Sequence, residues 1–183
     1  MLSKLSYWLL FRVLAWRLTG RYPYEVPKLV LIVAPHTSNW DFPIGVLVRS
    51  ALNINAWFVG KHTLFVGPLG PLMRWLRGMP VDRRKRGNFV DSAAALFEQN
   101  EYLHLVIAPE GTRKKVDRFK TGFYHIARKA GVPILLCAFD WENKIIHFEP
   151  QLFYPGTNEE EDMAFLWNYF KKYKGYAPEK GVL

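Results

Sequence analysis

The feature that most constrains the fold of this chain is an apolar run at residues 29–33, LVLIV, which ends at Pro35 and His36. A short run rich in β-branched residues indicates a strand that is buried on both faces. Pro35 has no backbone N–H to donate, so the strand is expected to stop there. The sequence therefore predicts that a histidine stands at the carboxyl end of a buried strand, where open α/β sheets bind their ligands.

Asp41 follows His36 by five positions, through a segment suited to a turn. On one continuous helix this spacing would turn the two side chains about 140° apart, so they converge only if a turn intervenes. Residues 37–39, TSN, favour such a turn followed by a helix start. Two interpretations stay open. Either the Asp41 carboxylate faces His36, or Ser38 and Asp41 form a capping box in which the carboxylate only caps its own helix.

Strand and helix patterns alternate along the rest of the chain. Strand patterns cover residues 56–59, 102–107, 134–139 and 144–148, and helical patterns cover residues 44–53, 72–76, 88–99, 122–129 and 159–172. This alternation predicts a single α/β domain with a largely parallel mixed central sheet flanked by helices. An antiparallel edge is expected where residues 144–148 return after a turn at residues 141–143.

Two further apolar strands also run into polar loops. Residues 56–59 lead to Lys61, and residues 102–107 lead to the segment EGTR at residues 110–113. If the strands lie side by side, their loops meet in one crevice with a base, cations and a carboxylate, which suits phosphates and developing oxyanions. The alternatives are a solvated lysine and a plain turn. A P-loop is not expected, because Asn55 replaces its first glycine and His62 its hydroxyl residue.

The sequence lacks the common signatures of a metal site or a serine nucleophile. It contains no HExxH, no paired cysteines and no GxSxG. Its one cysteine, Cys137, excludes an internal disulfide and lies within an apolar run, where a thiol is inert. We therefore expect no metal and no bound cofactor.

The chain has a formal charge of +9, which points to an anionic partner such as nucleic acid, lipid head groups or a phosphorylated substrate. Residues 1–18 are apolar, aromatic and basic, but Arg12 and Arg17 interrupt them and no cleavage site follows, so a signal peptide is not expected. We expect residues 1–20 to form an amphipathic helix, which lies in a membrane interface or packs on the protein's own core. Residues 28–183 are expected to form the main domain.

Two ordered motifs resemble those of the glycerolipid acyltransferases, including the lysophosphatidic acid acyltransferases. Residues 36–41, HTSNWD, match the His-x4-Asp motif, and residues 109–113, PEGTR, match the Pro-Glu-Gly-Thr-Arg motif. Between them, residues 61–70 and 78–83 look like the second block of the family. Ala108, where the family often has Phe, and Lys114, where a small hydroxyl residue is common, depart from the pattern and leave the acceptor and the acyl length open.

The resemblance implies direct transfer of a fatty acyl group from a thioester to the hydroxyl of a lysophospholipid, most simply lysophosphatidic acid. His36 would be the general base, and Asp41 would orient its ring. The implied substrate-binding residues are Lys61, Arg83, Glu110, Gly111, Thr112 and Arg113. The implied donor is acyl-CoA or acyl-carrier protein, and the implied location is peripheral (monotopic), on the cytoplasmic face of a membrane.

Two other functions stay open. The charge and the run RRKR at residues 83–86 suggest a basic nucleic-acid-binding module. However, the sequence shows no RNA-binding aromatic motif or recognition-helix arrangement, so no nucleic-acid partner is expected. The other alternative is a non-catalytic lipid-binding protein of the same fold. The sequence leaves the oligomeric state open.

Overall fold

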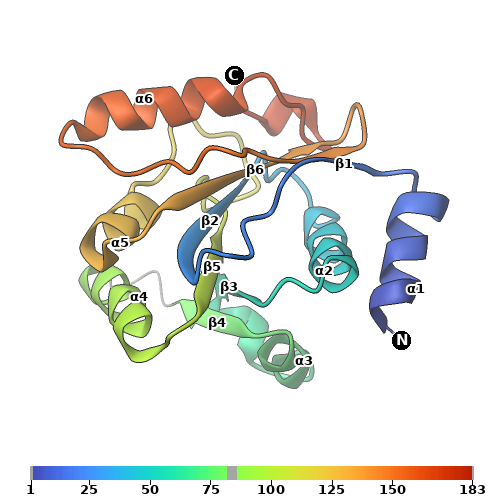
Figure 1. Ribbon diagram of the computed structural model, residues 1–183, viewed down its shortest axis with the longest axis horizontal. Coiled ribbons are helices and arrows are strands. Elements are labelled where there is room, and N and C mark those ends of the chain that lie inside the picture. The colour runs from blue at the N-terminus through green and yellow to red at the C-terminus, as the bar shows by residue number, and fades with distance from the viewer. Residues whose placement is uncertain (1, 82–85, 183) are drawn as a thin grey trace.

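The computed structural model describes residues 2–81 and 86–182, with the backbone alone for residues 86–88. These residues form a seven-stranded sheet in the order β1-β7-β6-β2-β5-β3-β4, with helices on both faces (Figure 1). The strands are β1 (Arg17–Gly20), β2 (Lys28–Ala34), β3 (Ala56–Lys61), β4 (Gly78–Val81), β5 (Leu103–Ile107), β6 (Ile134–Asp140) and β7 (Ile145–Phe148). The helices are α1 (Leu2–Trp8), η1 (Leu9–Val13), α2 (Asp41–Ala51), η2 (His62–Phe65), α3 (Gly70–Trp75), α4 (Arg86–Gln99), α5 (Gly122–Ala130), α6 (Glu159–Phe170) and η3 (Pro178–Lys180).

Strand β2 lies at the centre of the sheet because both of its faces are apolar. Val30, Ile32 and Ala34 belong to the core on one side of the sheet, and Leu29 and Leu31 belong to the core on the other side. All five are at most 5% exposed. The strand pairs in parallel with β5 and β6, which confirms the buried strand predicted at residues 29–33.

Two helical layers enclose the sheet (Figure 1). Helices α4, α5 and α6 cover one face, where Phe97 and Leu166 pack in the core with one side of β2. Helices α1 and α2 cover the other face, where Leu10 and Val48 pack with the opposite side of β2, and α3 lies beside them. The predicted α/β fold is therefore confirmed.

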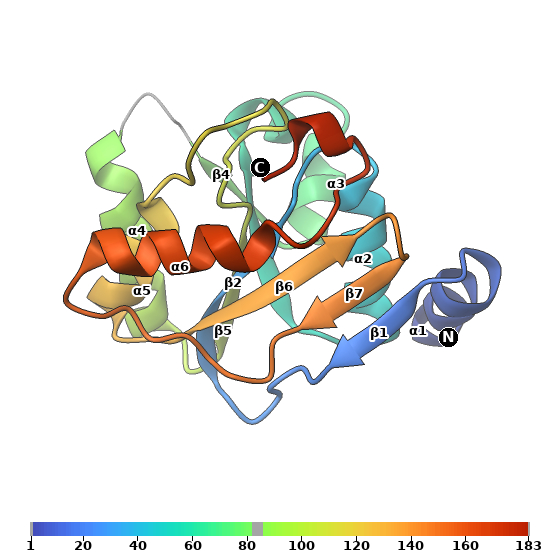
Figure 2. The same cartoon turned by 90° about the horizontal axis from the view of Figure 1, so that it is seen from above.

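The directions of the strands also follow the prediction. Strands β6, β2, β5, β3 and β4 run parallel to one another. Strand β7 is antiparallel to β6, and β1 is parallel to β7, so these two point the other way (Figure 2). The antiparallel edge predicted at residues 144–148 is thus present.

The N-terminal segment departs from the prediction of one helix over residues 1–20. The helix formed by α1 and η1 ends at Val13, and Ala15 has a left-handed φ of 56° that turns the chain aside. Trp16 then enters the core, at 4% exposed, and the next four residues form β1 beside β7. The segment is therefore joined to the main sheet, and the predicted boundary between residues 20 and 28 does not separate two units.

Strand β4 is a second element that the sequence pattern does not predict. It has four residues, one of which is Pro80, and lies at the edge of the sheet beside β3. A proline is tolerated in an edge strand because no further strand needs its missing N–H.

Candidate active site

Three neighbouring strands bring the predicted site loops to one edge of the sheet. β2, β5 and β3 lie side by side and run parallel. Leu31, Val106 and Phe58 form one row across them. Three residues further along the strands lie Ala34, Pro109 and Lys61. The loops that carry His36 and Glu110 therefore leave the sheet at the edge where Lys61 ends β3, which confirms the expected convergence.

The His36 ring and the Asp41 carboxylate contact each other at this edge. His36 Nδ1 lies 3.0 Å from Asp41 Oδ2. A proton on Nδ1 is donated to the carboxylate, so Nε2 is left as a proton acceptor. The Asp41 side chain is 3% exposed and the His36 side chain is 24% exposed. A histidine that is oriented by a buried carboxylate and open to solvent is arranged to accept a proton from a substrate.

Asp41 also fixes the loop on which His36 stands. Its Oδ2 accepts hydrogen bonds of 2.9 Å from the backbone N–H groups of Thr37 and Ser38. Ser38 Oγ accepts the Trp40 N–H at 3.2 Å, and within the described part of the chain Trp40, the N-cap residue of α2, makes no side-chain capping hydrogen bond. The interpretation in which the Asp41 carboxylate faces His36 therefore holds. The capping-box interpretation is wrong, because the N-cap residue of α2 is Trp40 and the Ser38 hydroxyl accepts from Trp40 instead of from the Asp41 N–H.

Trp141 is a residue of the site that the sequence analysis missed. Its indole Nε1–H donates a hydrogen bond of 2.7 Å to Asp41 Oδ1. Its ring packs edge-on against Trp16 and Tyr176, with ring centroids 4.9 Å apart in each case. Trp141 directly follows β6, which runs parallel to β2. The rule that placed His36 at the carboxyl end of its strand would have placed Trp141 at the same edge.

The C-terminal tail closes over this part of the site. The Ala177 N–H donates a hydrogen bond of 3.1 Å to Thr37 Oγ1, and the Trp141 N–H donates one of 2.8 Å to the Lys174 carbonyl. Gly175 lies so close to Thr37 that a Cβ at position 175 would be 2.5 Å from Oγ1. The tail therefore buttresses both the loop and the indole that hold Asp41.

Glu110 links the two sequence motifs. Its Oε1 accepts a hydrogen bond of 2.8 Å from the His36 backbone N–H. Glu110 is 3% exposed, and its Oε2 has no hydrogen-bond partner among the residues that the structure describes. Burial raises the pKa of Glu110 to about 7, although the hydrogen bond from His36 acts in the opposite direction. This carboxyl group therefore titrates near neutral pH, directly beneath the loop that carries His36.

The turn after Glu110 depends on glycine. Gly111 has a φ of +60°, and a Cβ there would lie 2.9 Å from Lys120 Cδ. The left-handed conformation is strained for other residues, so the backbone requires glycine here, whereas the flexible Lys120 side chain could move away from a Cβ. Thr112 Oγ1 accepts the Lys114 N–H at 3.2 Å and closes the turn.

Two of the three cations expected to bind the substrate lie at this edge. Lys61 ends β3, Arg113 follows the glycine turn, and both are exposed. An exposed guanidinium retains its full set of donors for a bidentate contact with a phosphate. Arg83 lies outside the described residues.

The His36–Asp41 pair and the PEGTR turn lie within the part of the chain that resembles proteins of a known family. Residues 18–140 match the sequence model of the family described as Acyltransferase, which is more than half of the chain. The chain therefore belongs to the acyltransferase family.

Individual relatives agree with this assignment. Two are named 1-acyl-sn-glycerol-3-phosphate acyltransferase, from Salmonella typhimurium strain LT2 and Escherichia coli K12, and each is 30% identical over 122 residues. Each match covers 63% of this chain and 49% of the relative, so the chain spans about half the length of these proteins. A crystal structure of the 1-acyl-sn-glycerophosphate acyltransferase PlsC from Thermotoga maritima superimposes with a TM-score of 0.64 at 22% identity, over 93% of this chain and 74% of that one. This last likeness concerns the fold.

Replacing Asp41 by asparagine should destabilise the protein although the two side chains have the same shape. Asp41 Oδ1 accepts from the Trp141 indole, and Oδ2 accepts from two backbone N–H groups. In asparagine an NH₂ group, which can only donate, replaces one of these two acceptors. We expect Asp41→Asn to lower the free energy of unfolding by about 3 kcal/mol, measured by urea denaturation. The control is Asp91→Asn, whose exposed ion pair with Lys129 is worth less than about 1 kcal/mol. Equal losses in the two variants would contradict this account.

Glu110→Gln should change how stability depends on pH. A carboxyl whose pKa is raised on folding holds its proton more tightly in the folded protein, so its contribution is full at low pH and is lost as pH rises through about 7. Between pH 4 and 8, the contribution of Glu110 should lower the wild-type free energy of unfolding by about 3 kcal/mol. The Glu110→Gln variant should not show this decrease. Denaturant titrations at several pH values measure it, with the exposed Glu98→Gln as the matched control. Parallel curves for the wild type and Glu110→Gln would refute the assignment.

Proposed function

We propose that this chain transfers a fatty acyl group from acyl-CoA or acyl-carrier protein to the free hydroxyl of lysophosphatidic acid, forming phosphatidic acid. The observation that carries the proposal is the His36–Asp41 pair, tied through Glu110 to the PEGTR turn. The names of the relatives support the choice of acceptor. The basic loops at the same edge suit both a phosphate on the acceptor and an acidic donor.

The reaction follows from the orientation of the imidazole. His36 Nε2 removes the proton from the acceptor hydroxyl as its oxygen attacks the thioester carbonyl carbon. Asp41 keeps the proton on Nδ1 and stabilises the imidazolium that forms. The tetrahedral intermediate then collapses, the carbon–sulfur bond breaks, and the thiolate takes the proton from Nε2. The products are the ester and the free thiol, and His36 returns to its starting state.

A covalent acyl-enzyme is not part of this scheme. Cys137 is 2% exposed within β6, and burial raises the pKa of its thiol. A buried, protonated thiol is a poor nucleophile, and the attacking oxygen in the proposed reaction comes from the acceptor itself.

The acceptor phosphate is proposed to lie among Lys61, Arg83 and Arg113. Lys61 ends β3, and Arg113 follows the neighbouring strand β5 by way of the turn that Gly111 allows. Both therefore lie at the edge that carries His36. Glu110, Gly111 and Thr112 shape that turn, which supports their place in the acceptor site.

We also propose a peripheral location on the cytoplasmic face of a membrane, with α1 in the interface. Within the described residues, no helix has the length and apolar character needed to cross a bilayer. The outer side of α1 exposes Leu2, Leu5 and Trp8 by 55% to 66%. Beside it runs an open groove of about 460 Å³, lined by Tyr7, Phe11, Arg12, Arg17, Leu18 and Leu52. Apolar and basic side chains in this arrangement suit acyl chains and phosphates at a lipid surface.

His36→Ala should abolish acyl transfer while the protein remains folded. Removal of a general base lowers kcat by about a thousandfold, with little change in KM for either substrate. Thiol release and product mass, followed with purified protein, lysophosphatidic acid and either acyl donor, measure it. The control is His125→Ala, a histidine on α5 whose side chain is 44% exposed. Full activity of His36→Ala would overturn the catalytic assignment, and vesicle binding without turnover by the wild type would favour a lipid-binding protein instead.

Arg113→Ala should weaken recognition of a phosphate and leave the chemistry intact. Loss of a charge-assisted bidentate contact is expected to raise KM for lysophosphatidic acid by about tenfold to a hundredfold. The KM for a monoacylglycerol, which has the hydroxyl but no phosphate, should stay unchanged. Lys115→Ala, two residues further along the chain and equally exposed, is the control. Equal losses with both acceptors would show that Arg113 supports the loop and does not bind the phosphate.

A further inference from the structure

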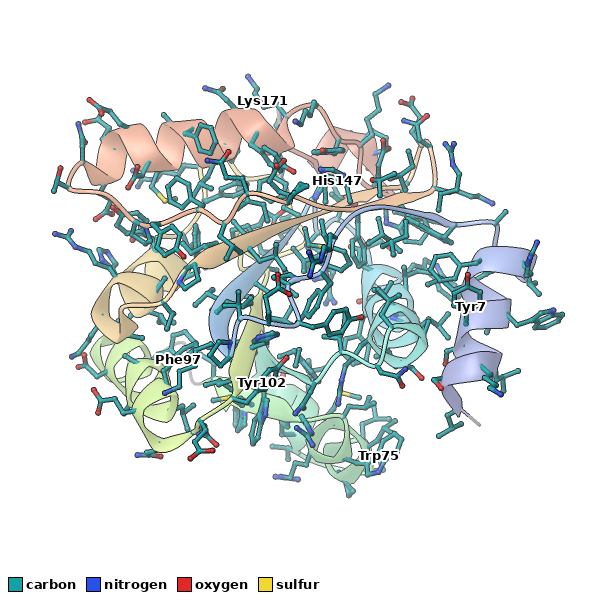
Figure 3. All side chains as sticks on the ribbon, viewed as in Figure 1. Tyr7, Trp75, Phe97, Tyr102, His147 and Lys171 are labelled. Carbon is teal, nitrogen blue, oxygen red and sulfur yellow. The ribbon has the colours of Figure 1, made fainter. Side chains whose placement is uncertain are left out.

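The segment from η2 to the end of α3 exposes a run of large apolar side chains. Leu64, Val66, Leu69, Leu72 and Trp75 are between 43% and 70% exposed, and Trp75 is the most exposed of them. Figure 3 shows Trp75 at the outer side of α3. Single exposed apolar residues are ordinary, but a continuous series marks an interaction surface.

The charges of this segment are of one sign. Residues 56–81 contain no Asp or Glu, whereas Lys61, Arg74 and Arg77 are all exposed. Apolar and aromatic side chains mixed with cations are typical of surfaces that lie in the interface of an anionic bilayer. A protein partner with an apolar face would not require that acidic residues be absent over the whole segment.

The N-terminal segment has the same character and is attached to the same helix, α2. Residues 1–24 also contain no Asp or Glu. Ser6 Oγ on α1 donates a hydrogen bond of 2.9 Å to Ser50 Oγ on α2, and the guanidinium of the preceding residue, Arg49, donates to the Leu76 carbonyl at the end of α3. Both segments are therefore attached to the last turn of α2, on one side of the sheet (Figure 1).

Exposed tryptophans occur on each helix of this side. Trp8 on α1, Trp40 at the start of α2 and Trp75 on α3 are 55%, 60% and 70% exposed. Trp collects at membrane interfaces because its ring is apolar and its N–H needs a polar partner.

Most of the net positive charge belongs to the part of the chain that supplies these helices. Residues 1–81, which supply α1, α2 and α3, contain nine Lys and Arg against two Asp and Glu. Residues 82–183 contain 16 Lys and Arg against 14 Asp and Glu. Helix α6, which begins with the acidic run at residues 159–162, covers the opposite face of the sheet (Figure 1). Attraction to an anionic surface therefore turns the α1–α3 side toward it.

We propose that residues 62–77 are a second membrane contact, which docks together with residues 2–18 on an anionic phospholipid bilayer. This inference rests on the proposed function, since it specifies how a lipid-modifying enzyme with an N-terminal interfacial helix sits on its substrate. The segment η2 begins directly after Lys61, and Trp40 directly precedes Asp41. The second contact therefore brings the lipid surface to the rim of the proposed acceptor site, so the acyl chain of the acceptor stays in the bilayer while its hydroxyl reaches His36.

Fluorescent labels at three positions, one in each variant, show which segments contact the lipid. Cys137 is buried, so a thiol-reactive, environment-sensitive fluorophore goes to an introduced cysteine. The full chain is labelled at Leu72→Cys on α3, at Leu5→Cys on α1, and at Phe165→Cys on α6, which is 54% exposed on the opposite face. With vesicles of phosphatidylcholine and phosphatidylglycerol, the labels at 5 and 72 should shift to shorter wavelength and be quenched by brominated lipid, and the label at 165 should not.

A matched pair of variants tests the contribution to binding. Leu72→Glu with Trp75→Glu should lower the partition coefficient onto phosphatidylglycerol-containing vesicles by about tenfold or more, and Phe165→Glu should not change it. The variant with both Leu72→Glu and Trp75→Glu should still acylate a short-chain, monodisperse acceptor at the wild-type rate, because neither residue belongs to the proposed site. That rate also shows that the variant is folded.

The outcomes separate the second contact from the proposed function. A label at 72 that stays in water while the label at 5 enters lipid would overturn the second contact and leave the N-terminal one standing. Vesicles that bind none of the labelled proteins would overturn the peripheral location itself. A shift of the label at 72 that needs no vesicles and grows with protein concentration would assign the surface to a second copy of this chain, against the proposal.

Discussion

The site depends on one buried carboxylate. Asp41 accepts hydrogen bonds from the backbone of its own preceding loop and from the indole of Trp141, and its Oδ2 faces the His36 ring. A buried charge is tolerated only where donors replace the water it has lost, and here the donors come from two segments a hundred residues apart. The position of the imidazole is therefore a consequence of how the loop, the end of β6 and the C-terminal tail meet at Asp41.

A second buried carboxyl group behaves differently because its surroundings differ. Glu110 receives one hydrogen bond, from the His36 N–H, and its other oxygen is unpartnered within the described part of the chain. Desolvation raises its pKa to about 7, and the nearby Asp41 adds to that rise. Two carboxyl groups close to one histidine thus differ in their surroundings: Asp41 orients the ring, and Glu110 gains or loses a proton near neutral pH. Glu110 holds the backbone of His36 and also interacts with the charge of the His36 ring, so its protonation is coupled both to the loop and to the imidazole.

The parts of the fold that sequence predicts are those where local pattern and burial agree. β2 and β6 are apolar runs buried on both faces, and the sheet they imply is present. The predicted helix over residues 1–20 is wrong at β1, because four residues without an alternating pattern do not indicate a strand by themselves and the partner strand β7 lies more than a hundred residues away. β4 is equally short and is interrupted by Pro80. Edge strands of this kind are defined by their neighbours and not by their own residues.

In the candidate site, too, contacts within one short segment can be predicted from sequence, and contacts between distant segments cannot. The contact between His36 and Asp41 was accessible to sequence reasoning because both belong to one short loop with turn and capping residues. The location of Trp141 after β6 was accessible in the same way, but its hydrogen bond to Asp41 was not, because that contact depends on the register of β6 against β2. Substrate contacts of Lys61, Arg83 and Arg113 stay predictions, since a cation on a loop has no partner within the sequence pattern that would fix its direction.

Helix α2 connects the chemistry to the proposed lipid surface. Its first residue is Asp41, and its last turn holds both α1, through Ser50, and the end of α3, through Arg49. The helix is 11 residues long, which corresponds to about 16 Å at the standard rise. A rigid element of this length fixes the distance between the His36 loop and the residues to which the two apolar segments are attached. An acceptor with one acyl chain and a phosphate places its free hydroxyl near the head-group level. In the proposed function, α2 therefore carries the His–Asp pair at one end and the attachment points of the two proposed membrane contacts at the other.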